Sequence, residues 1–166
     1  MSDKIQTIEN LSIGFKSQNG REVSILKDIS TQINKGETVG IVGESGSGKS
    51  TLALAMMGYT KQGLYTISGQ CLFKSKNLLN MTDRDLEKIR GKEIAMIPQN
   101  AGQSLTPNLK IGYQIEETLK LHSTINTKDR QLKITELLHK VRLPSPNIMA
   151  QRYPHELSGG QQQRVA

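Results

Sequence analysis

The stretch "GESGSGKST" limits the possible folds of this chain more than any other feature. It fits the pattern G-x-x-x-x-G-K-[ST], with its first glycine at Gly43. The apolar run "ETVGIVG" before it is short and bounded by glycines, which predicts a strand buried on both faces. The run "GKSTLALAMMG" after it is rich in Ala, Leu and Met and predicts a helix that Gly58 closes. A strand, a glycine loop and a helix in this order predict an α/β core.

The residue types of this loop suit the binding of a phosphate group. Glycines let the backbone curl so that successive N–H groups point at one anion, and the helix N-terminus adds its partial positive charge. Lys49 is expected to reach the terminal phosphates, and the Ser50 hydroxyl to ligate Mg²⁺. A chance match is the alternative, which the flanking strand and helix disfavour. We therefore predict a nucleoside triphosphate site at residues Gly43, Glu44, Ser45, Gly46, Ser47, Gly48, Lys49, Ser50 and Thr51.

Strand patterns dominate the first part of the chain and helix patterns the second. Apolar residues alternate around Leu11–Phe15 and Ile29–Ile33, with the hairpin signal Asn19-Gly20 between them. The segments "TISGQCLFK" and "EIAMIP" predict further strands, the second of them buried. From about residue 105 the apolar spacing becomes helical. The residues that carry this spacing are Ile111, Ile115, Leu119, Ile134, Leu137, Leu138 and Val141.

Composition excludes several classes of protein. The net charge of +7 would suit nucleic-acid binding, but the basic residues form no long run. Only four Tyr and two Phe are available for base stacking, so we expect no nucleic-acid partner. Cys71 is the only cysteine, which excludes an intrachain disulfide. No apolar stretch approaches the ~20 residues of a membrane-spanning helix.

A second phosphate-binding pattern occurs at "LSGGQQQRV". Ser158, Gly159 and Gly160 would place a hydroxyl and two unobstructed amides at a helix N-terminus, although an ordinary Ser cap is the simpler alternative. Together with "GESGSGKST", this stretch resembles the signature motif of ATP-binding cassette (ABC) ATPases. In that family one ATP lies between the glycine loop of one subunit and the signature of another. The resemblance implies that a partner's ATP is contacted by Leu157, Ser158, Gly159, Gly160 and Gln161.

Two more positions match residues of this family. Gln99, after the apolar run "EIAMIP", resembles the glutamine that helps to ligate Mg²⁺ together with Ser50 and that couples the nucleotide to the helical lobe. The resemblance implies that Lys49 and Gln99 serve catalysis. Phe15 matches the aromatic residue that stacks on adenine, with a place in an alternating core stripe as the alternative.

The middle of the chain is similar to one branch of the family. "RGKEIAMIPQNAGQSLTP" and "RYPHELSGG" resemble the ATPases of dipeptide, oligopeptide and nickel importers, although no acidic residue follows Gln99 directly. The resemblance implies a P-loop NTPase fold with an N-terminal antiparallel β subdomain. We expect that subdomain and the core in residues 1–100, and a helical subdomain in residues 101–166.

The resemblance also implies a function and a set of partners. We expect an energy-coupling subunit that binds ATP and Mg²⁺ and hydrolyses ATP when complete. It would pair with a second ABC ATPase, as a homodimer or a heterodimer, at the cytoplasmic face of the membrane. Transmembrane permease subunits would contact the helical subdomain and the glutamine loop, and an extracytoplasmic solute-binding protein would act indirectly.

The family's catalytic Glu, the Walker B strand before it and the switch His have no match in these 166 residues. Neither Glu44 in the loop nor Glu116 and Glu117 in a predicted helix are suitable substitutes. We therefore expect an N-terminal part of a longer ATPase, truncated inside the signature helix, unstable and almost inactive by itself. A catalytically inactive nucleotide-binding module is the alternative. ABC ATPases of DNA repair are disfavoured, because they insert long coiled coils between the two motifs.

Overall fold

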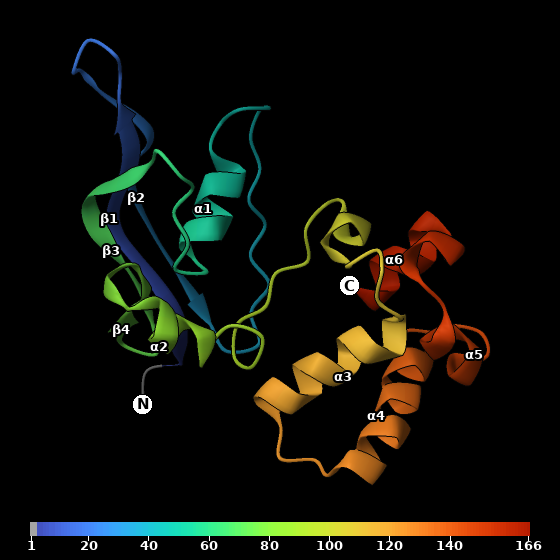
Figure 1. The fold of residues 1–166 in the computed structure, drawn as a ribbon. Helices are drawn as coiled ribbons and strands as arrows, with labels where there is room; N and C mark the ends of the chain where they lie inside the picture. The colour runs from blue at the N-terminus through green and yellow to red at the C-terminus, as the bar shows by residue number, and fades with distance from the viewer. Residues whose placement is uncertain (1–2) are drawn as a thin grey trace. The chain divides into compact units, whose positions relative to one another are not determined.

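The computed structural model describes residues 3–166. Contacts divide the chain into two compact units, Met1–Arg90 and Gly91–Ala166. Each unit has its own cluster of buried apolar side chains. Figure 1 shows a sheet with the helix α1 (Lys49–Ala55) in the first unit, and the helices from α3 (Ile111–His122) to α6 (Gly159–Val165) in the second.

An antiparallel sheet forms most of the first unit. Its strands are β1 (Lys4–Lys16), β2 (Glu22–Asn34), β3 (Tyr65–Phe73) and β4 (Lys76–Asn77), in the order β2-β1-β3-β4. At the turn between β1 and β2, the N–H of Gly20 donates to Ser17 O at 2.9 Å and Gly20 has a φ of +75°. The predicted Asn-Gly hairpin is therefore confirmed.

The inner face of this sheet packs against α1 (Lys49–Ala55). The alternation predicted for β1 is present, since Leu11 and Ile13 are fully buried. Residues from three strands and α1 share the core, namely Ile8, Leu11, Ile13, Leu26, Leu52, Ala55 and Cys71. This packing fixes the start of α1, and thus the glycine loop before it, on β2.

The helix ends of the first unit follow the sequence signals. Gly58 has a φ of +69° and closes α1, as its N–H donates to Ala55 O at 2.9 Å. The helix α2 (Asp83–Glu87) begins after Thr82, whose Oγ1 accepts from the N–H of Asp85 at 3.3 Å. The predicted C-terminal glycine is confirmed, and Thr82 is a residue type that commonly caps helices.

Two expected strands are absent from the described residues 3–166. Residues 37–43 have no regular secondary structure, and residues 93–98 contain only an isolated bridge at Ile94. Most of their apolar side chains are exposed, with Val42 at 93% and Ile97 at 73%. The prediction of two buried strands is therefore wrong for these segments. The physical reason is that a buried parallel strand needs hydrogen-bonded neighbours on its flanks, and the described residues supply none.

Helices form the second unit. They are α3 (Ile111–His122), α4 (Thr127–Lys140), α5 (Pro146–Gln151) and α6 (Gly159–Val165). Their apolar faces meet in a core of Leu105, Ile111, Ile134, Leu138, Leu143, Met149, Ala150 and Leu157. The backbones of α3 and α5 touch, because a Cβ on Gly112 would lie 2.9 Å from Ala150 O. None of the helices within residues 3–166 is long and apolar enough to cross a bilayer.

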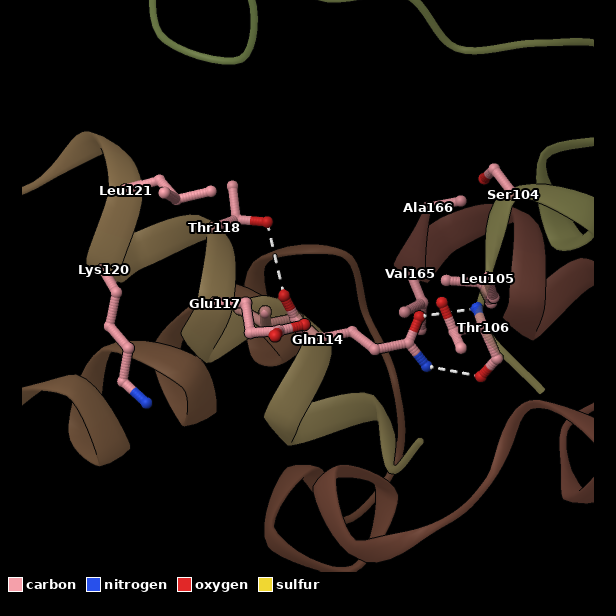
Figure 2. Close-up of a pocket in the computed structure, with 11 residues that line it drawn as sticks. Ser104, Leu105, Thr106, Gln114, Glu117, Thr118, Lys120, Leu121, Val165 and Ala166 are labelled. Atoms are coloured by element: carbon pink, nitrogen blue, oxygen red, sulfur yellow. Dashed lines mark hydrogen bonds between the residues drawn. The ribbon is translucent and has the colours of Figure 1, made fainter. Parts of the chain in front are cut away.

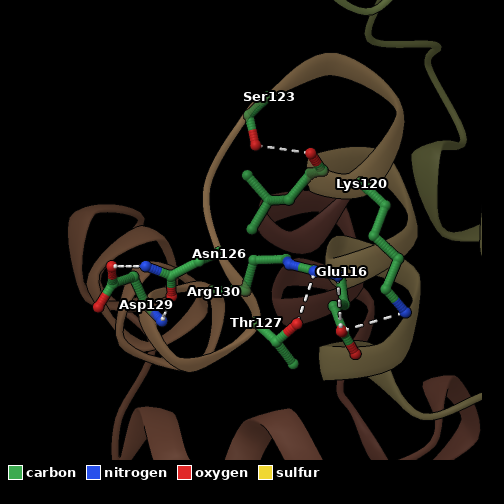
Figure 3. Close-up of polar contacts among 8 residues, drawn as sticks. Glu116, Lys120, Ser123, Asn126, Thr127, Asp129 and Arg130 are labelled. Carbon is green, nitrogen blue, oxygen red and sulfur yellow. Dashed lines mark hydrogen bonds and ion pairs between the residues drawn. The ribbon is translucent and has the colours of Figure 1, made fainter.

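A polar network joins α3 to α4 (Figure 3). Arg130 donates through Nη1 to Glu116 Oε1 at 3.2 Å and through Nη2 to Thr127 Oγ1 at 2.9 Å. The ammonium of Lys120 lies 3.1 Å from the same Glu116 oxygen. The Glu116 carboxylate thus has a structural role, which agrees with its exclusion as a catalytic base.

Cys71 gives a chemical probe of the first unit's core. Its side chain is completely buried, and burial raises the pKa of the thiol, opposed by a hydrogen bond from Gln6 Nε2 at 3.4 Å. We expect a thiol reagent to label Cys71 at least about 100-fold more slowly in the native protein than in denaturant, because the reactive thiolate is disfavoured and shielded. Peptide-resolved mass spectrometry of timed labelling measures this ratio. Equal labelling rates in the two conditions would contradict the packing of β3.

Candidate functional site

The start of α1 presents four amide groups without an internal partner. The first hydrogen bond of the helix runs from the N–H of Leu52 to Gly48 O at 2.9 Å. Within residues 3–166, the N–H groups from Gly48 to Thr51 donate no hydrogen bond, as expected for the first turn of a helix. The loop before them is exposed. Free amide groups at the start of a helix can bind an anion.

Glycine is required at position 48 by conformation and by packing. Gly48 has a φ of +91°, in the left-handed region. A Cβ there would lie 2.7 Å from Leu26 Cδ2 and 3.2 Å from Ile25 O, both in β2. The loop can therefore enter α1 close to the sheet only with glycine at this position.

The Lys49 side chain folds back over the loop. Its Nζ donates to Gly43 O at 2.8 Å, to Glu44 O at 2.5 Å and to Ser47 Oγ at 3.4 Å. An ammonium group has three donors, so these three acceptors use all of them. A phosphate oxygen could replace the Ser47 hydroxyl, whose contact is the longest. The ammonium group therefore lies against the glycine loop before any phosphate binds.

The other predicted nucleotide-site residues fall in both units. Ser50 is exposed in the first turn of α1. Phe15 is half-buried in β1, opposite Val23 of β2, and so extends the stripe of buried side chains to the end of the strand. Gln99 is exposed in a turn of the second unit. The structure thus places Phe15 and Ser50 in the unit of the glycine loop and Gln99 in the other.

The predicted helix start at Ser158 is confirmed. Ser158 Oγ accepts from the N–H of Gln161 at 3.4 Å, and Gln161 Oε1 accepts from the N–H of Ser158 at 2.9 Å. This reciprocal capping box occupies one of the amides that begin α6. In the described part of the chain, the N–H groups of Gly159 and Gly160 donate no hydrogen bond.

Among the described residues, no contact requires the two glycines of α6. A Cβ at Gly159 or Gly160 would meet nothing within 4 Å, and neither residue has a positive φ. Alanine is the better helix former, by about 1 kcal/mol. The contrast with Gly48 is clear, because there the fold itself excludes a side chain. At positions 159 and 160 the described residues leave space for a side chain.

Gln162 lies beside the predicted signature residues but is not predicted by any local pattern. Its Nε2 donates to Pro154 O at 2.8 Å and to Leu157 O at 3.1 Å, which holds the signature turn onto α6. Its side chain also packs on the backbone of Gly102. Gln99, Gly102, Gly159 and Gln162 line one pocket of about 470 Å³. Only a three-dimensional contact, and no local motif, reveals this role.

Gly102→Ala is expected to destabilise the second unit. The new Cβ would clash with the Gln162 side chain, which cannot move away without losing its two hydrogen bonds. We expect a loss of about 1–3 kcal/mol in the free energy of unfolding, measured by urea denaturation. Gly159→Ala, which adds the same atom in open space, is the matched control and should not destabilise. Equal stability of both variants would contradict the packing of Gly102 on Gln162.

Gln114 is a second residue that local patterns did not predict. It projects from α3, and its Oε1 accepts from the N–H of Thr106 at 2.9 Å while its Nε2 donates to Thr106 O at 3.0 Å (Figure 2). The side chain therefore pairs with the backbone as a neighbouring strand would. It borders a groove of about 610 Å³ that includes the apolar residues Leu105, Ile115 and Leu121. Leu121 is 79% exposed there.

Comparison with known proteins assigns the chain to a family. The sequence profile described as ABC transporter matches residues 26–166. The chain belongs to the ABC transporter family. The predicted family resemblance is therefore confirmed, and the match includes both the glycine loop and the start of α6.

The relatives of this ABC transporter chain include peptide transport proteins. It is 38% identical over 169 residues to the oligopeptide transport ATP-binding protein OppD of Bacillus subtilis (strain 168), covering 98% of this chain and 45% of OppD. It is 38% identical over 164 residues to the dipeptide transport ATP-binding protein DppD of Lactococcus lactis subsp. cremoris (strain MG1363), with coverages of 98% and 47%. The chain spans about half the length of these relatives.

Solved structures of ATP-binding cassettes share the fold. A dimeric, post-hydrolysis structure of the cassette MJ0796 bound to ADP and Pi superposes with a TM-score of 0.82 at 28% identity. The match covers 96% of this chain and 66% of that one. The prediction of an α/β ABC ATPase fold is confirmed.

Proposed function

We propose that the chain is the ATP-binding, energy-coupling part of a peptide importer, whose complete form hydrolyses ATP. The observation that carries this proposal is the start of α1, where four unpaired amides and the Lys49 ammonium meet at one exposed glycine loop. Charge, donor number and exposure all suit a polyphosphate. Membership in the ABC transporter family makes ATP the preferred polyphosphate.

Mg²⁺ would be held by few protein oxygens. No group of three or more His, Cys, Asp or Glu residues within residues 3–166 could hold a metal ion. The exposed Ser50 hydroxyl and the Gln99 amide oxygen are neutral, hard ligands of the kind that Mg²⁺ uses beside phosphate oxygens. When bound, the ion would neutralise phosphate charge.

Phe15 would stack on adenine. It lies half-buried at the end of the row of buried side chains in β1.

A dimer would complete the site. Gly159 and Gly160 offer two free amides, and the absence of a Cβ at both positions leaves space for a phosphate. In the proposed dimer, residues 157–161 would contact the phosphate of the nucleotide bound to the other subunit. The related MJ0796 cassette is dimeric in its ADP-bound structure, which supports this arrangement. In this proposal residues 1–100 form the nucleotide-binding core that contains the P-loop. Residues 101–166 form the helical subdomain that contains the signature.

Permease subunits are the proposed membrane partners. The groove beside α3 offers Leu105, Ile115 and Leu121 to an apolar segment and Lys120 and Glu117 to a polar one. Docking there would hold the protein at the cytoplasmic face of the membrane, with a solute-binding protein delivering cargo from the other side.

Uptake by cells tests the proposed cargo. Deletion of the gene should abolish accumulation of a labelled tripeptide, and the wild-type gene should restore it where Lys49→Ala should not. The names of the relatives favour peptides. Unchanged peptide uptake in the deletion strain would contradict the proposal, and a loss of nickel uptake instead would assign the importer to nickel.

A further inference from the structure

The C-terminal turn of α1 is held by side chains from elsewhere in the first unit. The carbonyl groups at the end of a helix lack intrahelical partners and need other donors. Here backbone N–H groups of the closing turn donate to the carbonyls of Leu52, Leu54 and Ala55. The carbonyls of Met56, Met57 and Gly58 accept instead from the side chains of Gln6 and Arg90.

The geometry of these contacts is specific. Arg90 donates through Nε to Met57 O and through Nη2 to Gly58 O, both at 2.9 Å. Gln6, which is 8% exposed, donates through Nε2 to Met56 O at 2.7 Å. A planar guanidinium can reach two neighbouring carbonyls at once, and its charge complements the negative end of the helix dipole.

The other end of this short helix is the proposed phosphate site. The seven residues of α1 span only about 10 Å, so a tilt at the C-terminal turn displaces the amides at the start. We infer that Arg90 and Gln6 are positioning residues for nucleotide binding, which keep the first turn of α1 and Lys49 aimed at the phosphates. This inference rests on the proposed function and adds residues outside both sequence motifs.

Lys88 provides a matched control for Arg90. It is a cation two positions earlier, its side chain is 67% exposed, and its Nζ lies 2.7 Å from the Asp85 carboxylate at the surface. Its polar partner is Asp85, and within the described residues it donates no hydrogen bond to a carbonyl of α1. A change at Lys88 therefore removes one positive charge from the same region without freeing a carbonyl of the helix.

The test compares Arg90→Met, Arg90→Lys, Lys88→Met and Lys49→Ala in the complete gene product. We expect Arg90→Met to raise the Kd and the KM for ATP about tenfold, with kcat at saturating ATP within about twofold of wild type. Arg90→Lys should recover part of the affinity, because lysine keeps the charge but lacks the planar pair of donors that reaches both carbonyls. Lys88→Met should bind ATP as wild type does. Equilibrium binding of a fluorescent ATP analogue and steady-state ATPase rates give these values.

Each outcome separates the inference from the proposed function. Wild-type ATP affinity in Arg90→Met, with loss of affinity in Lys49→Ala, would overturn the inference alone. Retained affinity in Lys49→Ala would overturn the proposed P-loop function. If Arg90→Met does not fold, Arg90→Lys and Gln6→Met replace it, with an expected loss of about threefold each. Wild-type affinity in both of these would also overturn the inference.

Discussion

Lys49→Ala is expected to weaken ATP binding at least about 100-fold, which corresponds to about 2.7 kcal/mol. The ammonium already lies at the mouth of the loop, bonded to Gly43 O, Glu44 O and Ser47 Oγ. A bound triphosphate would place several negative charges next to this one cation. Alanine would remove the positive charge and also the hydrogen bonds that hold the loop. Only the free amides of α1 would then be left to bind the phosphates.

Equilibrium binding of a fluorescent ATP analogue to the complete gene product measures this loss. Lys61→Ala is the matched control, because Lys61 is an exposed lysine of the same unit outside the loop. The control should bind ATP within about twofold of wild type, as an exposed charge contributes little. An affinity of Lys49→Ala within about threefold of wild type would contradict the assignment of the phosphate site.

Gly159→Glu is expected to abolish ATP-dependent dimerisation without destabilising the subunit. The new side chain would enter open space at the start of α6, where an acidic residue is favourable by about 0.3–1 kcal/mol. In the proposed dimer, however, the same carboxylate would meet the partner's triphosphate. Repulsion and steric exclusion should weaken the dimer at least about 100-fold. ATP binding to the monomer should remain within about twofold, because the P-loop is unchanged.

Sedimentation with a slowly hydrolysed ATP analogue measures the dimer, and thermal unfolding measures the subunit. Gln131→Glu, which adds a carboxylate on the exposed face of α4, should dimerise normally. Gly159→Ala separates the contribution of size from that of charge. Normal dimerisation of Gly159→Glu, or its unfolding at a markedly lower temperature than wild type, would count against an external ligand at these glycines.

The features that local sequence predicts are those that local interactions determine. The Asn19-Gly20 hairpin, the Thr82 cap and the Ser158 cap each depend on residues within a few positions of one another, and all three are present. The glycine loop belongs to the same class, because its backbone follows from Gly46 and Gly48 at positive φ.

Features that depend on distant partners were not predicted, or were predicted wrongly. Residues 37–43 and 93–98 have the composition of buried strands, but strand structure also needs neighbours that their own sequence does not specify. The contacts of Arg90 with Met57 and of Gln162 with Gly102 join segments that only the fold brings together. A glutamine or arginine in a polar stretch gives no sign of which backbone groups it will reach.

The central claim is that one nucleotide binds between the P-loop of one subunit and the signature of another. A photoreactive group on the γ-phosphate of ATP tests this claim directly when labelled peptides are mapped separately in the monomer and the dimer of the complete gene product. The account predicts labelling of residues 43–51 in both species, and of residues 157–161 only in the dimer. Labelling of residues 157–161 in the monomer, or its absence from the dimer, would contradict it.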